Sequence, residues 1–456
     1  METKTDPLKA LDNGEVGKYI LRGTILVTFA VAFLDGYDLV NIGLYLPTIT
    51  KLFAASAFEE GLVSSILIGG AVVGAVFFGY LSSKIGPRTM IIVDFALYGI
   101  GAVFSAFSVN IDMLLLMRFI IGLGFGGDFA IAPALIADMV PKDRRGRYQA
   151  MMFYGYPAGA FVAILTSFII SLAGIPVTLA WRIVLGLGVV PTIVVILLRT
   201  RLSQSPRWLL YTGRMNEFKQ SVSKISGIKE ENLEDVKINK KTGIGDIFRN
   251  YGRQFTAVMM GFLSLALGFP VLYVSVAIKH VGITSFASII GFNLLTWTIA
   301  LIGVTYVYFS VDSPRKRMGR KFNLAIGIAV EATTNFAIAM LLAPQYAVVV
   351  VVLIGISLFG VYVVESQALT MQGEIFPSDI KTTAGGITFG LNRLIFFIDS
   401  TLVAIAFSVN FFSGFLIIEA VIQFSALAVF LLLAGETKSK SLETITRVSE
   451  EIEKTD

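Results

Sequence analysis

Four ionisable residues lie inside two long apolar runs, where they could bind and release protons. Asp35 and Asp38 are three residues apart in the first run, and Arg118 and Asp128 lie in the fourth. If these runs cross a bilayer, residues three apart share one helix face. An ionisable side chain at mid-membrane depth costs several kcal/mol, so it is a candidate for function by default. The pattern therefore predicts a buried charge network with proton chemistry.

The depth of each residue can be compared from the helical rise of about 1.5 Å per residue. With the first helix running outward and the fourth inward, Asp38 and Arg118 lie at a similar outer depth and are predicted to form an ion pair. Asp35 and Asp128 lie near the middle, where one carboxyl group is expected to hold a proton near neutral pH. The alternative is a static, neutralised network that only holds the two helices together.

Other polar residues in the apolar runs are candidates for binding a solute. Arg393 could hold a carboxylate or phosphate with two hydrogen bonds, or it could instead pair with Glu365 or Asp399. Glu331 and Glu419 are expected at the periphery or in helix contacts. Side chains that could supply hydrogen bonds or stacking to a substrate are Tyr37, Tyr154, Asn293, Trp297, Tyr362, Gln367 and Asn392.

The composition indicates that lipid is the solvent of this chain. Of 456 residues, 55% are hydrophobic and 15% charged, against roughly 25% charged in soluble proteins. There are no cysteines and a single histidine, His280, which argues against disulfides, a histidine metal site or an enzyme, and no cofactor is expected. The net charge of +5 resides in short loops rather than in a basic patch, so no nucleic-acid partner is predicted.

Apolar runs long enough to span a bilayer, roughly 20 residues each, recur along the chain. They predict an all-α integral membrane protein of about twelve transmembrane helices, near 22–46, 60–82, 89–109, 113–139, 149–172, 181–199, 255–277, 285–310, 322–343, 346–371, 385–408 and 411–434. The predicted domains are a cytoplasmic segment 1–21, a six-helix bundle 22–199, a cytoplasmic linker 200–254, a second bundle 255–434 and a cytoplasmic tail 435–456.

The basic residues of the loops are distributed unevenly across the predicted membrane. One side receives Lys84, Arg88 and Lys142, while the other receives little beyond Lys51 and Lys279. Because cytoplasmic loops are enriched in Lys and Arg, both termini are predicted to be cytoplasmic. The expected location is the plasma membrane, with several passes.

Several loop motifs repeat at about half the chain length. Lys84–Arg88 after the second helix corresponds to Arg317–Lys321 after the eighth. Val140–Gly146 after the fourth helix corresponds to Phe376–Lys381 after the tenth. The repetition predicts two related halves.

At five places the motifs resemble the sugar-porter-like branch of the major facilitator superfamily. They are Arg118–Gly124, Trp181-Arg182, Ser205–Leu209, Glu374–Pro377 and Glu436–Lys438. The resemblance implies two pseudo-symmetric six-helix bundles that open alternately to each side and a protein that works as a single chain. It also implies a gating role for the residues that match the family's cytoplasmic motifs, which are Lys84, Gly86, Arg88, Arg145, Arg207, Arg317, Gly319, Arg320, Glu374 and Glu436.

The chain departs from the family pattern in two respects. Ser83 occupies the usual acidic position after the second helix, and Asp94 is a candidate substitute for that carboxylate in the cytoplasmic latch. The seventh helix lacks the paired glutamines of sugar porters. We therefore predict proton-coupled symport of a small polar solute across the bilayer, with an anion favoured over a sugar. The alternatives are a sugar transporter of the same fold, proton-coupled or passive, and a solute sensor that does not transport.

Overall fold

The computed structural model describes residues 4–13, 18–200, 203–238, 242–268, 286–314, 318–446 and 452–455. Much of the predicted seventh span and Arg317 lie outside these residues. Within them, ten helices are long and apolar enough to cross a membrane. The predicted seventh and eighth spans correspond to α13 (Gly252–Leu267) and α15 (Phe286–Ser310). The architecture is that of a helical membrane protein, in agreement with about twelve predicted spans.

The chain forms two compact units by its internal contacts. Unit 1 comprises Met1–Ile247, Gln372–Gly390 and Ser439–Asp456, and unit 2 comprises Phe248–Met371 and Leu391–Lys438. Short segments from the second half of the sequence therefore belong to unit 1. The two six-helix halves expected from the sequence stay a prediction.

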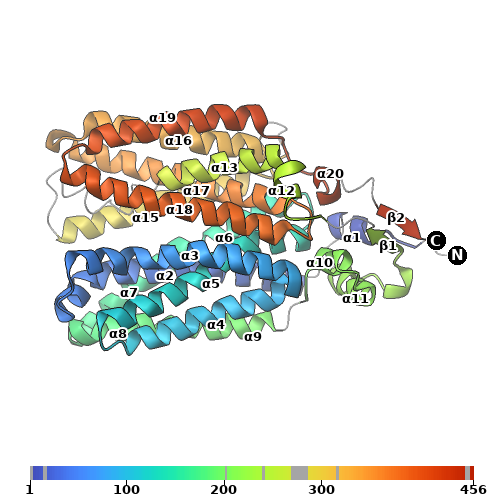
Figure 1. Ribbon diagram of the computed structural model, residues 1–456, viewed down its shortest axis with the longest axis horizontal. Coiled ribbons are helices and arrows are strands. Elements are labelled where there is room, and N and C mark those ends of the chain that lie inside the picture. The colour runs from blue at the N-terminus through green and yellow to red at the C-terminus, as the bar shows by residue number, and fades with distance from the viewer. Residues whose placement is uncertain are drawn as a thin grey trace. The chain divides into compact units, whose positions relative to one another are not determined.

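Unit 1 is built around four long helices that run side by side (Figure 1). These are α2 (Lys18–Leu52), α3 (Ala57–Ile85), α4 (Pro87–Ala106) and α5 (Ile111–Met139). The predicted fifth and sixth spans are each broken, into α6 (Arg145–Phe153) with α7 (Gly155–Leu172) and into α8 (Val177–Leu187) with α9 (Val189–Arg199).

The helices of unit 1 approach closely because glycines remove side-chain bulk at the crossings. A Cβ added at Gly74 on α3 would collide with the backbone of Leu123 on α5, and one added at Gly122 would collide with the backbone of Leu67. Small residues at such crossings are typical of membrane helices, where close van der Waals contact stabilises association. The crossing fixes the depth of α5, which carries Arg118 and Asp128.

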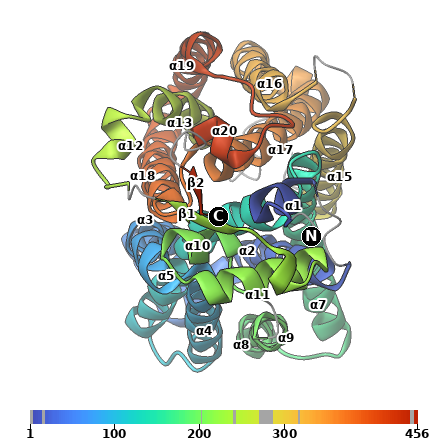
Figure 2. The ribbon, with the colours of Figure 1, turned by 90° about the vertical axis from the view of Figure 1, so that its right-hand side faces the viewer.

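Short elements of unit 1 lie at one end of its long helices (Figure 2). They are α1 (Pro7–Asn13), α10 (Pro206–Tyr211), α11 (Met215–Ser226) and α20 (Leu442–Thr446). Strand β1 (Asp235–Ile238) pairs antiparallel with β2 (Ile452–Thr455), with Asp235 opposite Thr455. Helix α12 (Asp246–Arg249) follows β1. The linker predicted between the halves is therefore partly ordered in short elements.

Unit 2 contains α13, α15, α16 (Arg320–Leu341), α17 (Ala347–Ile375) and α19 (Phe412–Leu433). Helix α18 (Lys381–Ser408) begins in unit 1 and continues in unit 2 from Leu391. Figure 1 shows α13, α16 and α19 side by side, and these helices contact one another. Polar residues on their contacting faces, described below, are buried among apolar side chains.

Candidate functional site

A buried ion pair joins α2 and α5. Nη1 of Arg118 lies 3.2 Å from Oδ2 of Asp38, and both side chains are almost fully buried. Nε of Arg118 also donates a hydrogen bond of 2.8 Å to the carbonyl oxygen of Val63 on α3. The ion pair expected from the depth comparison is therefore present, and it neutralises both charges inside the apolar interior.

Asp35 and Asp128 are also buried, on α2 and α5 respectively. No residue that the structure describes forms a hydrogen bond with Oδ1 of Asp128. The pairing of Asp35 with Asp128 stays a prediction. The nearby Tyr37 donates a hydrogen bond of 2.7 Å to the carbonyl oxygen of Val184, which engages its hydroxyl group in a helix contact. Tyr154 lies half-buried at the break between α6 and α7.

Asp94 does not serve the latch for which the sequence suggested it. Its side chain is fully buried on α4, and neither carboxylate oxygen has a hydrogen-bond partner among the described residues. A Cβ added at Gly127 would lie 2.7 Å from Oδ2 of Asp94. The carboxylate therefore lies directly against the backbone of α5, beside Asp128. The cytoplasmic cluster described below takes its carboxylates from other residues.

In unit 2 the candidate substrate-binding residues are buried on α17 and α18. Arg393 has Glu365 as its carboxylate neighbour, with Nη2 3.9 Å from Oε1, and its guanidinium lies 6.0 Å from the ring centre of Phe396. Asn392 donates a hydrogen bond of 2.7 Å to the carbonyl oxygen of Phe262. Its Oδ1 has no hydrogen-bond partner within the residues described above. Oδ1 of Asn392 can therefore accept a further hydrogen bond, and it lies next in sequence to Arg393, whose charge Glu365 offsets.

The remaining substrate-binding candidates differ in how far the structure describes them. Tyr362 and Gln367 are fully buried on α17, and in the described part of the chain Oε1 of Gln367 has no hydrogen-bond partner. Trp297 is half-buried on α15. The side chain of Asn293 lies outside the described part of the structure. Their role in substrate binding stays a prediction.

Two acidic residues expected at the periphery or in helix contacts are buried between helices. Glu331 on α16 accepts a hydrogen bond from the hydroxyl group of Ser264. Glu419 on α19 is buried and hydrogen-bonds with Asp399 on α18. Both residues therefore lie in helix contacts, the second of the two expected settings, and their partners Ser264 and Asp399 are polar contacts that an apolar helix pattern does not reveal.

Several predicted gating residues meet in a buried cluster of unit 1, which we call the cytoplasmic cluster after the side of the membrane that the sequence predicts for it. Oδ1 of Asp12 on α1 lies 2.6 Å from Arg145 and 2.8 Å from Arg207. Oε1 of Glu443 on α20 lies 2.9 Å from Arg207. Glu374 is buried and acts electrostatically on Arg145. The carboxylates of Asp12 and Glu443 thereby pair with the guanidinium groups of Arg145 and Arg207, although the four residues are distant in sequence.

The pairing in this cluster changes the acidity of its members. Burial alone lowers the pKa of Arg207, but the carboxylates of Glu443 and Asp12 offset burial and raise that pKa above its ordinary value. Burial raises the pKa of Glu443, and the adjacent Arg207 lowers it below its ordinary value. Both groups are therefore held in their charged forms.

Asp138 anchors a second part of the cytoplasmic cluster. Its Oδ1 lies 2.6 Å from Nζ of Lys381 and accepts a hydrogen bond of 3.2 Å from Ser378. Its Oδ2 accepts a hydrogen bond of 2.6 Å from Ser205. Sequence reasoning missed Asp12, Asp138 and Lys381. The position of Lys381 in the repeated loop motif was the one available signal, and nothing in the polar segment around Asp12 marks it.

The remaining gating residues cap two corresponding helices. In unit 1, Oε1 of Gln204 accepts a hydrogen bond of 2.8 Å from the backbone N–H of Arg88, next to Gly86, which has a φ of +99°. In unit 2, Oε1 of Glu436 accepts one of 3.0 Å from the backbone N–H of Arg320, next to Gly319. A side chain at either glycine would collide with the capping group.

The charged side chains next to these caps make their own contacts. Nη1 of Arg320 lies 2.6 Å from Asp312. Nζ of Lys84 lies 5.6 Å from the ring centre of Tyr80. The two caps give the sequence repeat a structural counterpart, since the same position of each half holds a helix N-terminus.

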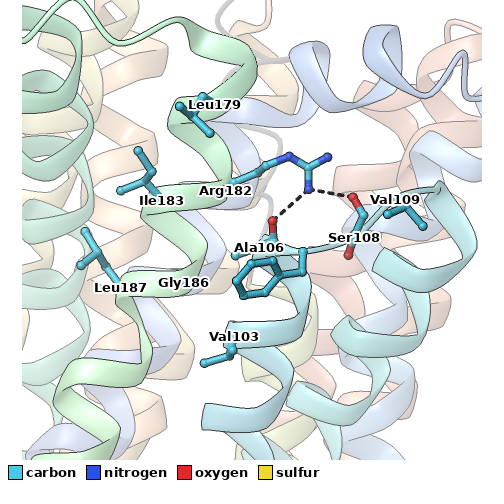
Figure 3. Close-up of a pocket in the computed structure, with 10 residues that line it drawn as sticks. Val103, Ala106, Ser108, Val109, Leu179, Arg182, Ile183, Gly186 and Leu187 are labelled. Carbon is cyan, nitrogen blue, oxygen red and sulfur yellow. Dashed lines mark hydrogen bonds between the residues drawn. The ribbon is translucent and has the colours of Figure 1, made fainter.

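A groove of about 620 Å³ lies between the ends of α4 and α8 (Figure 3). Its lining is mostly apolar, and its one charged residue, Arg182, donates hydrogen bonds of 2.9 and 2.7 Å to the carbonyl oxygens of Ala106 and Ser108. The guanidinium therefore caps the C-terminal end of α4. The groove does not include the buried acids, and its apolar lining suits lipid chains rather than a polar solute.

Comparison with known proteins places this arrangement in a family. The profile of the family described as "Sugar (and other) transporter" matches residues 24–448. The chain belongs to this family. Because it is a family of transporters, the prediction of a transporter rather than an enzyme is confirmed, and so is the resemblance read from the motifs.

Individual proteins with transport functions also resemble this chain. The chain is 30% identical to the arabinose-proton symporter of Bacillus subtilis, over 91% of this chain and 92% of that protein. It is 28% identical to a putative metabolite transport protein of Escherichia coli, over 90% and 91%. A structure of the proton:xylose symporter XylE superposes with a TM-score of 0.81 at 20% identity, covering 93% of this chain and 98% of that one. The fold is therefore that of the major facilitator superfamily.

Proposed function

We propose that this protein is a proton-coupled symporter of a small, neutral, hydroxyl-rich solute, working by alternating access in the plasma membrane. The observation that carries the proposal is the buried Asp38–Arg118 ion pair, with the further carboxyl groups of Asp35 and Asp128 in the same unit. Such acids are costly in an apolar interior unless they bind protons or counter-ions. The arabinose-proton symporter that resembles this chain supports the coupling to protons.

The preference for an anionic substrate is not supported. That preference rested on Arg118 and Arg393, and each arginine lies beside a carboxylate, Asp38 and Glu365 respectively. A substrate anion would have to displace that neighbour. The unpartnered amide oxygens of Asn392 and Gln367 instead suit the hydroxyl groups of a pentose, hexose or polyol.

We assign the proposed roles by unit. In unit 1, Asp35, Asp38, Arg118 and Asp128 couple transport to the proton, and in unit 2, Arg393, Asn392, Gln367, Tyr362 and Trp297 contact the solute. The cytoplasmic cluster and the two helix caps act in gating. Both termini face the cytoplasm and the protein works as a monomer.

The test is uptake by the purified protein in liposomes, with and without an inward proton gradient. The labelled panel contains a pentose, a hexose, a polyol, an aromatic acid and phosphate. Gradient-driven accumulation of one neutral solute is the expected result. Accumulation of an anion alone would overturn the neutral-substrate proposal, and equilibration that ignores the gradient would overturn proton coupling.

A further inference from the structure

The carboxylate of Asp94 is an unusual group in the interior of unit 1. It is fully buried in the membrane-spanning helix α4, and within the part of the chain that the structure describes neither of its oxygens has a hydrogen-bond partner. It lies against α5 at Gly127, where an added Cβ would come within 2.9 Å of both oxygens and the carboxyl carbon. An ionised carboxylate without hydrogen bonds in such a place costs several kcal/mol or more. The protonated form of Asp94 avoids that cost.

Asp128, the residue after Gly127, is the charged neighbour of this carboxylate. It too is buried, its Oδ1 has no partner, and it acts electrostatically on Asp94. Two carboxylates that share an apolar site cannot both ionise readily, because like charges in low dielectric repel strongly. The pair is therefore more stable with one proton bound than with both carboxylates ionised.

The other charged groups on the neighbouring helices are engaged elsewhere. Arg182 on α8 bonds to carbonyl groups at the far end of α4, and Arg199 on α9 lies beside Arg88 at the start of α4. Lys84 on α3 lies over the ring of Tyr80. On α2, Asp35 and Asp38 lie towards Tyr98, about one turn beyond Asp94, and Asp38 is paired with Arg118.

We propose that Asp94 and Asp128 form a proton-binding pair and that the transported proton is held there in the loaded state. In loading, one carboxylate gains a proton and becomes a neutral carboxylic acid, which removes the repulsion between the two like charges. In release, the O–H bond breaks and the proton leaves to water. Gly127 is a positioning residue, because only a residue without Cβ allows Asp94 this close to α5. This inference rests on the proposed proton coupling and deepens it.

The first test detects the proton directly. Infrared spectra of the purified protein, recorded through a pH titration, report the C=O stretch of buried carboxylic acids. We expect one such band to disappear in Asp94→Asn and to shift in Asp128→Asn, while Asp35→Asn and Asp399→Asn leave it unchanged. A band that survives both Asp94→Asn and Asp128→Asn, or that is lost in Asp35→Asn, would overturn the proposal.

The second test measures coupling in liposomes with a substrate from the panel above. Asp94→Asn is expected to keep solute exchange in the absence of a gradient and to lose gradient-driven accumulation. Gly127→Ala should reproduce that loss, whereas Gly69→Ala, where an added Cβ meets nothing within 4 Å, should not. Full accumulation by Asp94→Asn would overturn the proposal. If the wild-type protein itself ignores the gradient, the proposed function fails, and the infrared result still decides where the proton binds.

Discussion

Nζ of Lys381 lies 2.6 Å from Oδ1 of Asp138, although the two residues are 243 positions apart in the sequence. Both side chains are buried, and both belong to unit 1. A charged pair with this geometry, supported by Ser205 and Ser378, stabilises the arrangement in which it is formed. Loss of one partner is strongly unfavourable, because it leaves the other charge buried alone.

The Lys381–Asp138 pair should hold the cytoplasmic end of unit 1 closed. Lys381→Met removes the cation while keeping most of the side-chain volume. Because the chain has no cysteine, Thr382→Cys provides a clean reporter at a buried position. We expect the reporter to react faster with a maleimide in Lys381→Met than in the background with Lys381 intact. A second reporter, Ser439→Cys at an exposed position, should react equally in both, and equal rates at Thr382→Cys would contradict the prediction.

Glu443 should stabilise the fold over most of the physiological pH range. Its pKa in the folded protein is below the ordinary value, so its contribution is complete above the unfolded pKa of about 4.3 and is lost as the pH falls through the lower folded value. Glu443→Gln is expected to lower the free energy of unfolding by about 2 kcal/mol. Melting curves from pH 8 to 4 should show a constant difference from wild type that shrinks only at more acid pH. The exposed Glu217→Gln serves as the control, and a difference that varies around neutral pH would argue against this assignment.

A single and a double variant should distinguish a structural role of the Asp38–Arg118 pair from a role in transport. Asp38→Asn leaves the buried charge of Arg118 without its carboxylate, which costs about 3–5 kcal/mol by analogy with other buried pairs. The double variant Asp38→Asn with Arg118→Gln removes both charges and should recover much of the thermal stability without recovering accumulation of solute. If the double variant transports normally, the pair serves stability alone.

The helix cap at Gln204 should depend on an acceptor at its position. Gln204→Ala leaves the backbone N–H of Arg88 at the start of α4 without its acceptor, which we expect to cost about 1 kcal/mol, the usual effect of losing a cap. Gln204→Glu copies the carboxylate of Glu436 in unit 2 and is expected to gain roughly 0.3–1 kcal/mol, because a helix N-terminus favours negative charge. Chemical denaturation of the three proteins measures both effects. Glu436→Gln tests the reverse change, and a stable Gln204→Ala would show that the cap is dispensable.

The sequence predicted the long helices well because lipid imposes a simple rule on them. A run of about 20 apolar residues identifies a span, and Asp38 and Arg118 were paired correctly from the constant helical rise alone. The breaks at Tyr154 and Gly188 were missed because apolar composition continues through them. The polar contact of Glu331 was missed because its neighbour Ser264 lies on a helix distant in sequence.

Contacts between distant segments were the hardest features to predict. Asp12 lies in a polar segment whose composition does not distinguish a free tail from a packed helix. Asp94 was predicted to take part in the cytoplasmic latch, but it faces Gly127 on α5. The depth of a residue on α4 does not tell which residue of α5 it faces. The absence of a side chain at Gly127 decides that contact, and a glycine in an apolar run indicates close helix packing without identifying the partner.

Unit 1 combines segments from the beginning and the end of the chain, and this sets an order of events during biosynthesis. Asp12 leaves the ribosome early, whereas Lys381 and Glu443, which complete the pairing of Asp138 and Arg207, are translated long afterwards. The early segments are therefore made with these charges only partly compensated. Their final packing has to wait until the later segments return to them, so a chain stalled in mid-translation would expose Asp138 and Arg207 to the quality-control machinery of the membrane.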